Sequence, residues 1–309
     1  MRAVAIDSYG GPEVLRLQDV PDPKVGPDSA LVEVAAASIN PVDYRIMQGY
    51  LDAAFPVVFP LTLGWDVAGK VVAAGPAVRS VHVGQDVIGY ARMDFVGAGT
   101  WADRVAVPAR SVAPAPPSLD AAGASCLPLA GLTAYQSLVE VLQVGQGDTV
   151  LVHAASGGVG HLAVQIALAQ GARVIGSASA RNADFLRGLG AEPVEYGDGL
   201  VDAVRALAPH GVDAGLDLAG GPGLEQFPEL VRTPGRFVSI VDADAVQRLG
   251  GTYVFVRPDA GHLGQLAALV DAGRLQPVVQ ATHALADVRT AVEEAMGGVR
   301  GKVVLTREA

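Results

Sequence analysis

The chain has 309 residues, of which 50% are hydrophobic, 17% are charged and a single one is Cys, and its formal net charge at pH 7 is -10. This composition excludes intrinsic disorder, a disulfide-stapled scaffold and a zinc site built from four thiolates. An acidic chain also lacks the clustered Lys and Arg that neutralise phosphates, so we expect no nucleic-acid partner.

Up to Pro117 the chain consists of short Val-rich segments that are separated by Gly and Pro. Four of these segments cover residues 31–35, 69–73, 86–89 and 104–107. Short strands at close spacing predict a small antiparallel β-barrel or sandwich. The chain starts with apolar alternation over residues 2–6 and has no basic region before it, so we expect no signal peptide.

From Thr149 onwards, apolar strands alternate with helices, which predicts βαβ units on a parallel sheet and an α/β fold class. The expected strands are residues 149–153, 173–177, 213–218 and 236–241. The expected helices are residues 158–170, 181–189, 201–207 and 224–232. Two later helices, over 261–272 and 285–296, and a strand over 302–306 could close the first domain or extend the second.

The stretch from Thr149 to Ala172 contains no Asp, Glu, Lys or Arg and is long enough to span a bilayer. A cluster of glycines at its centre would leave backbone groups unpaired in lipid, however. A buried strand, a tight turn and a buried helix account for the same composition. We therefore expect a soluble, cytoplasmic protein with no membrane partner.

The turn in this stretch reads Ala155-Ser156-Gly157-Gly158-Val159-Gly160, which fits G-x-G-x-x-G with Ala in the first position. Small residues here let backbone amides approach a pyrophosphate and let the helix pack closely on the strand. A glycine-rich turn without a ligand could have the same sequence. Its place between an apolar strand and a helix is the context that a dinucleotide site requires, so the turn predicts dinucleotide binding.

The end of the next strand indicates which dinucleotide is bound. NAD sites usually carry an acidic residue about 20 residues after the glycine turn. Here the first acid is Asp184, inside the next helix, whereas the strand ends at Ser177 and continues into Ser179 and Arg181. Two hydroxyls and a guanidinium suit a 2′-phosphate and favour NADP(H). The alternative is that Ser179 only caps the helix and that Arg181 is a solvated surface residue.

Seven segments, in this order along the chain, resemble the zinc-independent quinone oxidoreductase branch of the medium-chain dehydrogenase/reductase superfamily. They are residues 39–43, 63–69, 131–135, 155–160, 189–191, 217–221 and 301–305. The resemblance covers nearly the whole chain. It implies a GroES-like β-rich catalytic domain over residues 1–122 and 257–309, and an inserted Rossmann domain with a doubly wound parallel sheet over 123–256. It also implies a homodimer.

Zinc-containing relatives in this superfamily place metal ligands where this chain has residues 40–43 and 64–66, and neither segment contains Cys or His. The single thiol, Cys126, lies in an apolar stretch, and the six His residues are scattered without ligand spacing. We therefore expect no metal. Without a Lewis acid the alkoxide of an alcohol is hard to stabilise, so alcohol oxidation is disfavoured.

Reduction of an activated acceptor needs no metal. A quinone or an α,β-unsaturated carbonyl takes hydride at carbon, and the protein must only position the nicotinamide and place donors near the carbonyl oxygen. Asn40, Tyr44 and Arg45 are the candidate catalytic groups. The resemblance places Asn40 beside the nicotinamide and often has Lys at position 45. Arg45 keeps its proton near neutral pH, so Tyr44 or water is the better proton donor.

Each candidate also has a structural interpretation. Asn40 could be a turn residue before Pro41, and Tyr44 and Arg45 could be surface groups. The resemblance adds Thr133 at the nicotinamide and Tyr196 near the adenosine phosphate, which could equally be a helix cap and a packing residue. Two other functions stay open for the whole chain. They are an enoyl-thioester reductase on the same scaffold and a protein that binds NADPH without turnover.

Overall fold

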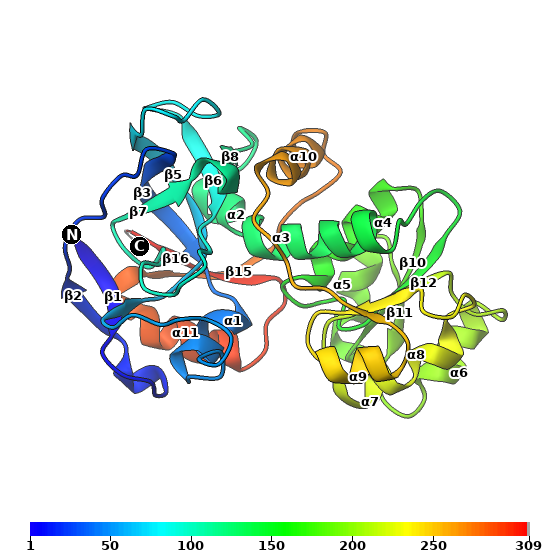
Figure 1. Ribbon diagram of the computed structural model, residues 1–309. Coiled ribbons are helices and arrows are strands. Elements are labelled where there is room, and N and C mark those ends of the chain that lie inside the picture. The colour runs from blue at the N-terminus through cyan, green and yellow to red at the C-terminus, as the bar shows by residue number, and fades with distance from the viewer. Residues whose placement is uncertain (308–309) are drawn as a thin grey trace. The chain divides into compact units, whose positions relative to one another are not determined.

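The computed structural model describes residues 1–307 and shows a mixed α/β protein of two compact units (Figure 1). Unit 1 consists of Met1–Leu132, Pro258–Asp271 and Pro277–Ala309, and unit 2 of Thr133–Arg257 and Ala272–Gln276. Both ends of the chain thus belong to the first, β-rich unit. The first boundary lies inside a helix at Leu132, later than the expected end of the domain at residue 122, and residues 272–276 belong to unit 2.

Unit 1 is built on a mainly antiparallel sheet in the order β15-β16-β3-β5-β6-β8, with β7 also paired to β3. Its strands are β3 (Ser29–Ser38), β5 (Asp66–Ala74), β6 (Asp86–Tyr90), β7 (Arg104–Pro108), β8 (Val112–Pro114), β15 (Val279–Ala284) and β16 (Lys302–Thr306). A smaller sheet has the order β2-β1-β4, formed by β1 (Arg2–Ile6), β2 (Arg16–Asp19) and β4 (Leu61–Thr62). The predicted GroES-like β-rich domain is confirmed.

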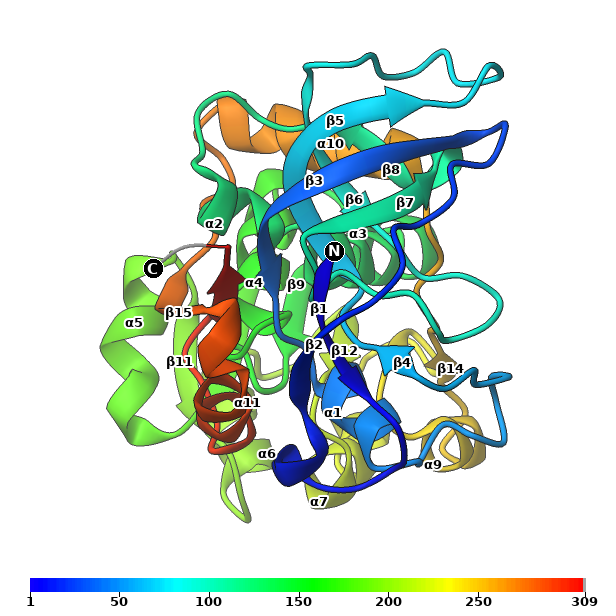
Figure 2. The same cartoon turned by 90° about the vertical axis from the view of Figure 1, so that its left-hand side faces the viewer.

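Strand β16 joins the two ends of the chain within unit 1. It pairs antiparallel with β3, where Val304 faces Ser38, and parallel with β15 (Figure 2). The helices of this unit are α1 (Pro41–Met47), α2 (Ala121–Ser125), α3 (Pro128–Tyr135, which continues into unit 2), α10 (Ala260–Asp271) and α11 (Val288–Met296). Helix α1 begins at Pro41, shortly after β3 ends at Ser38, where β16 pairs with β3.

Unit 2 contains six parallel strands in the order β11-β10-β9-β12-β13-β14. They are β9 (Thr149–Val152), β10 (Arg173–Ala178), β11 (Glu192–Glu195), β12 (Ala214–Asp217), β13 (Phe237–Ser239) and β14 (Thr252–Tyr253). Numbered from the first strand, this is the order 3-2-1-4-5-6 of a doubly wound dinucleotide-binding sheet. The predicted Rossmann fold is confirmed.

The helices of unit 2 are α4 (Gly160–Ala169), α5 (Ala183–Gly188), α6 (Leu200–Leu207), α7 (Gly221–Glu225), α8 (Phe227–Leu230) and α9 (Ala243–Arg248), and a π-helical turn covers Gln136–Val141. The single helix expected over 224–232 is wrong. The structure has α7 and α8 instead, because Pro228 lies at the start of α8, where its missing N–H is tolerated, and cannot continue α7.

The uncharged stretch from Thr149 to Ala172 forms β9, the glycine turn and α4, and its large apolar side chains are fully buried except those of Val159 and Leu168, which are partly buried. Burying each one stabilises the fold by about 1.5–3 kcal/mol, which explains the absence of charge here. Over residues 1–307, no helix has both the length and the apolar character needed to cross a membrane.

Candidate functional site

The glycine turn connects the carboxyl end of β9 to helix α4. Ala154 has a positive φ of 59°, which is uncommon for a residue with a side chain and marks a sharply bent turn. A Cβ at Gly160 would lie 2.7 Å from the Cα and the carbonyl carbon of Ala155, so only Gly fits where the helix meets the turn. A Cβ at Gly157 would meet only the Ala154 carbonyl oxygen, at 3.4 Å, so that side of the turn is open. This cradle fits a pyrophosphate.

The sequence predicts Ser177 as a ligand of the 2′-phosphate, but the structure gives its hydroxyl another role. Ser177 is fully buried, and its Oγ lies 2.6 Å from His153 Nδ1 and accepts a hydrogen bond from the Ala154 N–H (3.3 Å). Burial lowers the pKa of His153, and the Asp217 carboxylate opposes this shift. The buried Ser177 hydroxyl therefore holds the backbone of the glycine turn at Ala154.

Ser179 and Arg181 lie beyond the end of β10, next to the short 3-10 helix η4 (Ala180–Asn182). Arg181 is exposed and, within residues 1–307, makes no ion pair, so its guanidinium is available to a ligand. Asn182 donates from Nδ2 to Ser156 Oγ (2.9 Å) and to Ser179 Oγ (3.4 Å). It thus joins the glycine turn to the expected phosphate site.

Asn182 is a residue that the sequence analysis missed. No motif marks it, because its partner Ser156 lies 26 positions earlier in the chain. Of the other expected cofactor residues, Tyr196 follows β11 and is 54% exposed, whereas Thr133 is buried in helix α3. Since β9, β10 and β11 are parallel, the glycine turn, Ser179, Arg181 and Tyr196 follow the carboxyl ends of neighbouring strands.

In unit 1, a buried polar network surrounds Asn40. Its Nδ2 donates to Asp66 Oδ2 (2.8 Å) and to the Ser38 carbonyl (3.4 Å), and its Oδ1 accepts from Lys302 Nζ. Asp66 also accepts from Ser38 Oγ (2.6 Å) and from the Leu129 N–H (2.7 Å). Burial raises the pKa of Asp66, and the Lys302 ammonium is the strongest of the groups that oppose the shift.

Because both N–H donors of the Asn40 amide are used inside the protein, Asn40 is not free to donate a hydrogen bond to a carbonyl oxygen of an acceptor. The other two candidates, Tyr44 and Arg45, lie on helix α1 and are half-buried and exposed, respectively. Burial raises the pKa of the Tyr44 hydroxyl, and the Arg45 guanidinium opposes this shift. Of the three candidates, Tyr44 and Arg45 are the ones whose side chains can donate to a ligand.

Asp43 closes the first turn of α1. Its Oδ2 accepts from the Asn40 N–H (2.7 Å), while its Oδ1 is buried and has no hydrogen-bond partner among residues 1–307. Burial raises the pKa of Asp43 to about 8, and the Asp66 carboxylate adds to the shift. At neutral pH the Asp43 carboxyl is therefore mostly protonated.

Replacing Asp43 with Asn is expected to stabilise the protein, by about 1 kcal/mol or more at pH 7.5. The wild-type carboxyl ionises near pH 4 when unfolded and near pH 8 when folded, so wild-type stability falls as the pH rises through this window. Asn does not titrate, and the stability difference between variant and wild type should grow from pH 4 to pH 8. Urea denaturation of both proteins from pH 4 to pH 8 measures this difference in the free energy of unfolding. A difference that does not change with pH would contradict the raised pKa of Asp43.

The segments where the resemblance places zinc ligands, residues 40–43 and 64–66, contain no Cys or His and are occupied by other contacts. Trp65 packs against the rings of Phe55 (centroids 6.0 Å apart) and Tyr90 (5.9 Å). The neighbouring positions 40 and 66 hold Asn and Asp, which bind the Lys302 ammonium. Throughout residues 1–307, no group of three or more His, Cys, Asp or Glu side chains could hold a metal ion.

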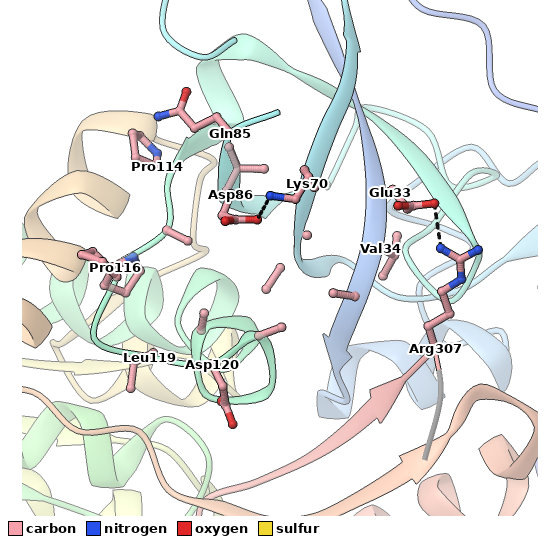
Figure 3. Close-up of a pocket in the computed structure, with 18 residues that line it drawn as sticks. Glu33, Val34, Lys70, Gln85, Asp86, Pro114, Pro116, Leu119, Asp120 and Arg307 are labelled. Atoms are coloured by element: carbon pink, nitrogen blue, oxygen red, sulfur yellow. Dashed lines mark hydrogen bonds and ion pairs between the residues drawn. The ribbon is translucent and has the colours of Figure 1, made fainter. Parts of the chain in front are cut away.

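A separate cavity of about 860 Å³ lies over the sheet of unit 1 (Figure 3). Its charged side chains bind one another, since Lys70 pairs with Asp86 (2.7 Å) and Glu33 with Arg307 (2.7 Å). Asp120, on its wall, is the N-cap of α2 and accepts from the Gly123 N–H. None of the candidate catalytic or cofactor-binding residues lines this cavity.

Comparison with known proteins adds independent information. The alcohol dehydrogenase GroES-like domain family matches residues 26–117, and the zinc-binding dehydrogenase family matches residues 189–305. A chloroplastic quinone-oxidoreductase homolog of Spinacia oleracea is 30% identical over 331 residues, covering 99% of this chain and 98% of the relative. The solved quinone oxidoreductase of Coxiella burnetii is 33% identical with a TM-score of 0.87, covering 99% of both chains. A mycobacterial protein solved with NADPH is 28% identical with a TM-score of 0.84, covering 99% of this chain and 100% of that one.

Proposed function

This chain belongs to the quinone oxidoreductase branch of the medium-chain dehydrogenase/reductase superfamily, and on that premise we propose that it reduces quinones or α,β-unsaturated carbonyls with NADPH and without zinc. The observation that carries the proposal is that the Lys302 ammonium is bound to Asn40 and lies 3.9 Å from Asp66, in the two segments where the family resemblance places zinc ligands. Without a Lewis acid, only an acceptor that is already activated accepts hydride readily.

The cofactor residues support NADPH. We propose that the glycine turn over residues 155–160 binds the pyrophosphate and that Ser179 and Arg181 bind the 2′-phosphate, with Tyr196 beside it and Thr133 at the nicotinamide. Asn182 holds the first two parts together through Ser156 and Ser179. Ser177 is not a ligand in this proposal, because it is buried beneath the turn. When bound, NADPH supplies the hydride.

The residues of unit 1 then bind the acceptor. Tyr44 and Arg45 donate hydrogen bonds to its carbonyl oxygen and stabilise the negative charge that develops there. A guanidinium is a poor proton donor, so the proton that follows comes from Tyr44 or from water. Asn40 has a different task, because its amide is held by Asp66 and Lys302 and fixes the start of helix α1.

Oxidation of NADPH against four acceptors tests the activity. We expect turnover with a benzoquinone and a 2-alkenal, none with a saturated aldehyde, and rates that a chelator does not change. Faster turnover of an enoyl-thioester would favour the enoyl-thioester reductase. Binding of NADPH without turnover of any acceptor would favour the protein that binds without catalysis, and a chelator-sensitive rate restored by Zn²⁺ would contradict the metal-free proposal.

Replacing Arg181 with Ala is expected to weaken NADPH binding by about 10- to 100-fold and to leave NADH binding unchanged. The guanidinium makes charge-assisted hydrogen bonds to the 2′-phosphate, which NADH lacks. Titration of both cofactors by nicotinamide fluorescence measures the change. Arg187→Ala is the matched control, because Arg187 is exposed on the next helix and paired with Asp184. If Arg181→Ala lost the same affinity for NADPH and for NADH, Arg181 would not be the residue that binds the 2′-phosphate.

We further propose a cytoplasmic homodimer. Strand β14 is the last strand of the unit 2 sheet, and Phe255, two residues after it, is 47% exposed. A strand edge beside an exposed aromatic side chain can pair with the same edge of a second copy. Sedimentation equilibrium of the wild type tests the dimer.

A further inference from the structure

Lys302 is a buried ammonium at the first position of β16, and its residue is only 2% exposed. Its Nζ donates to the Ile39 carbonyl (3.1 Å) and to Asn40 Oδ1, and lies 3.9 Å from Asp66 Oδ2. We propose that Lys302 is a positioning residue for the reduction, which acts by fixing the Asn40 side chain and thereby the start of helix α1. This inference rests on the proposed function.

The chemistry of the two partners allows one orientation of the Asn40 amide. An ammonium has three donors and no acceptor, so Lys302 can face only the amide oxygen. The Asp66 carboxylate accepts hydrogen bonds, so it faces the amide nitrogen, at 2.8 Å. If the amide were rotated by 180°, its NH₂ group would face the Lys302 ammonium, which is also a donor. Its oxygen would then face the Asp66 carboxylate, which is also an acceptor. The two groups together therefore hold Asn40 in a single state.

The orientation of Asn40 is transmitted to the groups that face the acceptor. Asn40 is the N-cap of α1, and its N–H closes the capping box with Asp43. Tyr44 and Arg45 lie in the next turn of this short helix. Because Lys302 comes from the strand that pairs with the end of β3, it holds the helix start from a different part of the chain.

A different explanation is that Lys302 only balances the buried charge of Asp66. Both explanations predict a loss of stability when Lys302 is replaced, because a buried charge loses its partner. They differ in whether the effect on turnover passes through Asn40. A double-mutant cycle between Lys302 and Asn40 isolates that coupling.

The cycle compares wild type, Lys302→Met, Asn40→Ala and the double variant, with kcat, the acceptor KM, the Kd for NADPH and Tm measured for each. We expect Lys302→Met to lower kcat roughly 100-fold, since small displacements of positioned groups cost this much. The Kd for NADPH should stay within about twofold of wild type, because the cofactor residues are in the other unit. In the Asn40→Ala background, Lys302→Met should lower kcat by less than about threefold.

Lys70→Met is the matched control, because Lys70 is an exposed lysine of the same unit, and its kcat should equal that of wild type. If Lys302→Met does not fold, the cycle is run with Lys302→Arg, which keeps the charge but not the compact donor. We then expect Lys302→Arg to lower kcat by about fivefold in the wild-type background and to leave kcat unchanged in the Asn40→Ala background.

The inference would be overturned if the fold-losses in kcat of Lys302→Met and Asn40→Ala multiplied in the double variant. It would also be overturned if Lys302→Met had the kcat of wild type. Both outcomes leave the proposed function intact, because they require an active wild type. A wild type without turnover would remove the proposed function and this inference with it.

Discussion

Replacing Gly160 with Val is expected to raise the Kd for NADPH by about 100-fold, which equals about 2.8 kcal/mol. The new Cβ would lie 2.7 Å from two backbone carbons of Ala155, and backbone atoms cannot rotate away as a side chain can. The turn must therefore open, and its amides leave the positions that a pyrophosphate needs. Fluorescence titration with NADPH measures the loss.

Gly188→Ala is the control for this experiment. Gly188 ends helix α5 in the same unit, and a Cβ there would meet no atom within 4 Å. Ala is the better helix former, so this variant should bind NADPH as wild type does and gain up to about 1 kcal/mol of stability. If Gly160→Val bound NADPH as tightly as Gly188→Ala, the glycine turn would not be the pyrophosphate site.

Replacing Asp66 with Ala is expected to lower the free energy of unfolding by about 3–5 kcal/mol, because it leaves a buried ammonium without its carboxylate. Asp66 is fully buried and accepts three hydrogen bonds, from Ser38, Asn40 and Leu129. Lys302 and Asn40 would both lose a buried partner. Urea denaturation followed by circular dichroism measures the change.

Asp86→Ala separates this effect from the general loss of an acidic side chain. Asp86 pairs with Lys70 at the surface of the same unit, where both side chains are at least half exposed. Such a pair contributes about 0–1 kcal/mol, so the control should stay near wild type. If Asp66→Ala lowered the free energy of unfolding by only about 0–1 kcal/mol, the hydrogen-bond network around Asn40 would not contribute to stability as proposed.

The sequence predicted the parts of the fold that depend on local pattern. Alternating strands and helices after Thr149 indicated a parallel sheet, and the small residues at 155–160 indicated the turn between β9 and α4. Family resemblance, not pattern, assigned the last strand to the first domain. Pro228 marks the point where the helix expected over 224–232 divides into α7 and α8, and the prediction did not take this proline into account.

The site residues were harder to predict because their partners lie far away in the chain. Ser177 and Ser179 look equivalent in the sequence, but the first is on the strand and buried while the second lies beyond its end. Asn40 could be recognised as a candidate, yet the lysine that occupies its amide oxygen is 262 residues away. Pattern reasoning gives the residue type at a position and leaves its long-range hydrogen-bond partners undetermined.

The most direct test of the account follows hydride itself in metal-free protein. Chelator-treated enzyme is mixed with NADPH deuterated at both C4 positions and a 2-alkenal, and the product is analysed by mass spectrometry and NMR. We expect a saturated aldehyde with one deuterium at the β-carbon, at the rate of untreated enzyme, since hydride goes to carbon while the oxygen is held by Tyr44 and Arg45. Deuterium at the carbonyl carbon, giving an alcohol, or a reaction that requires added Zn²⁺ would contradict it.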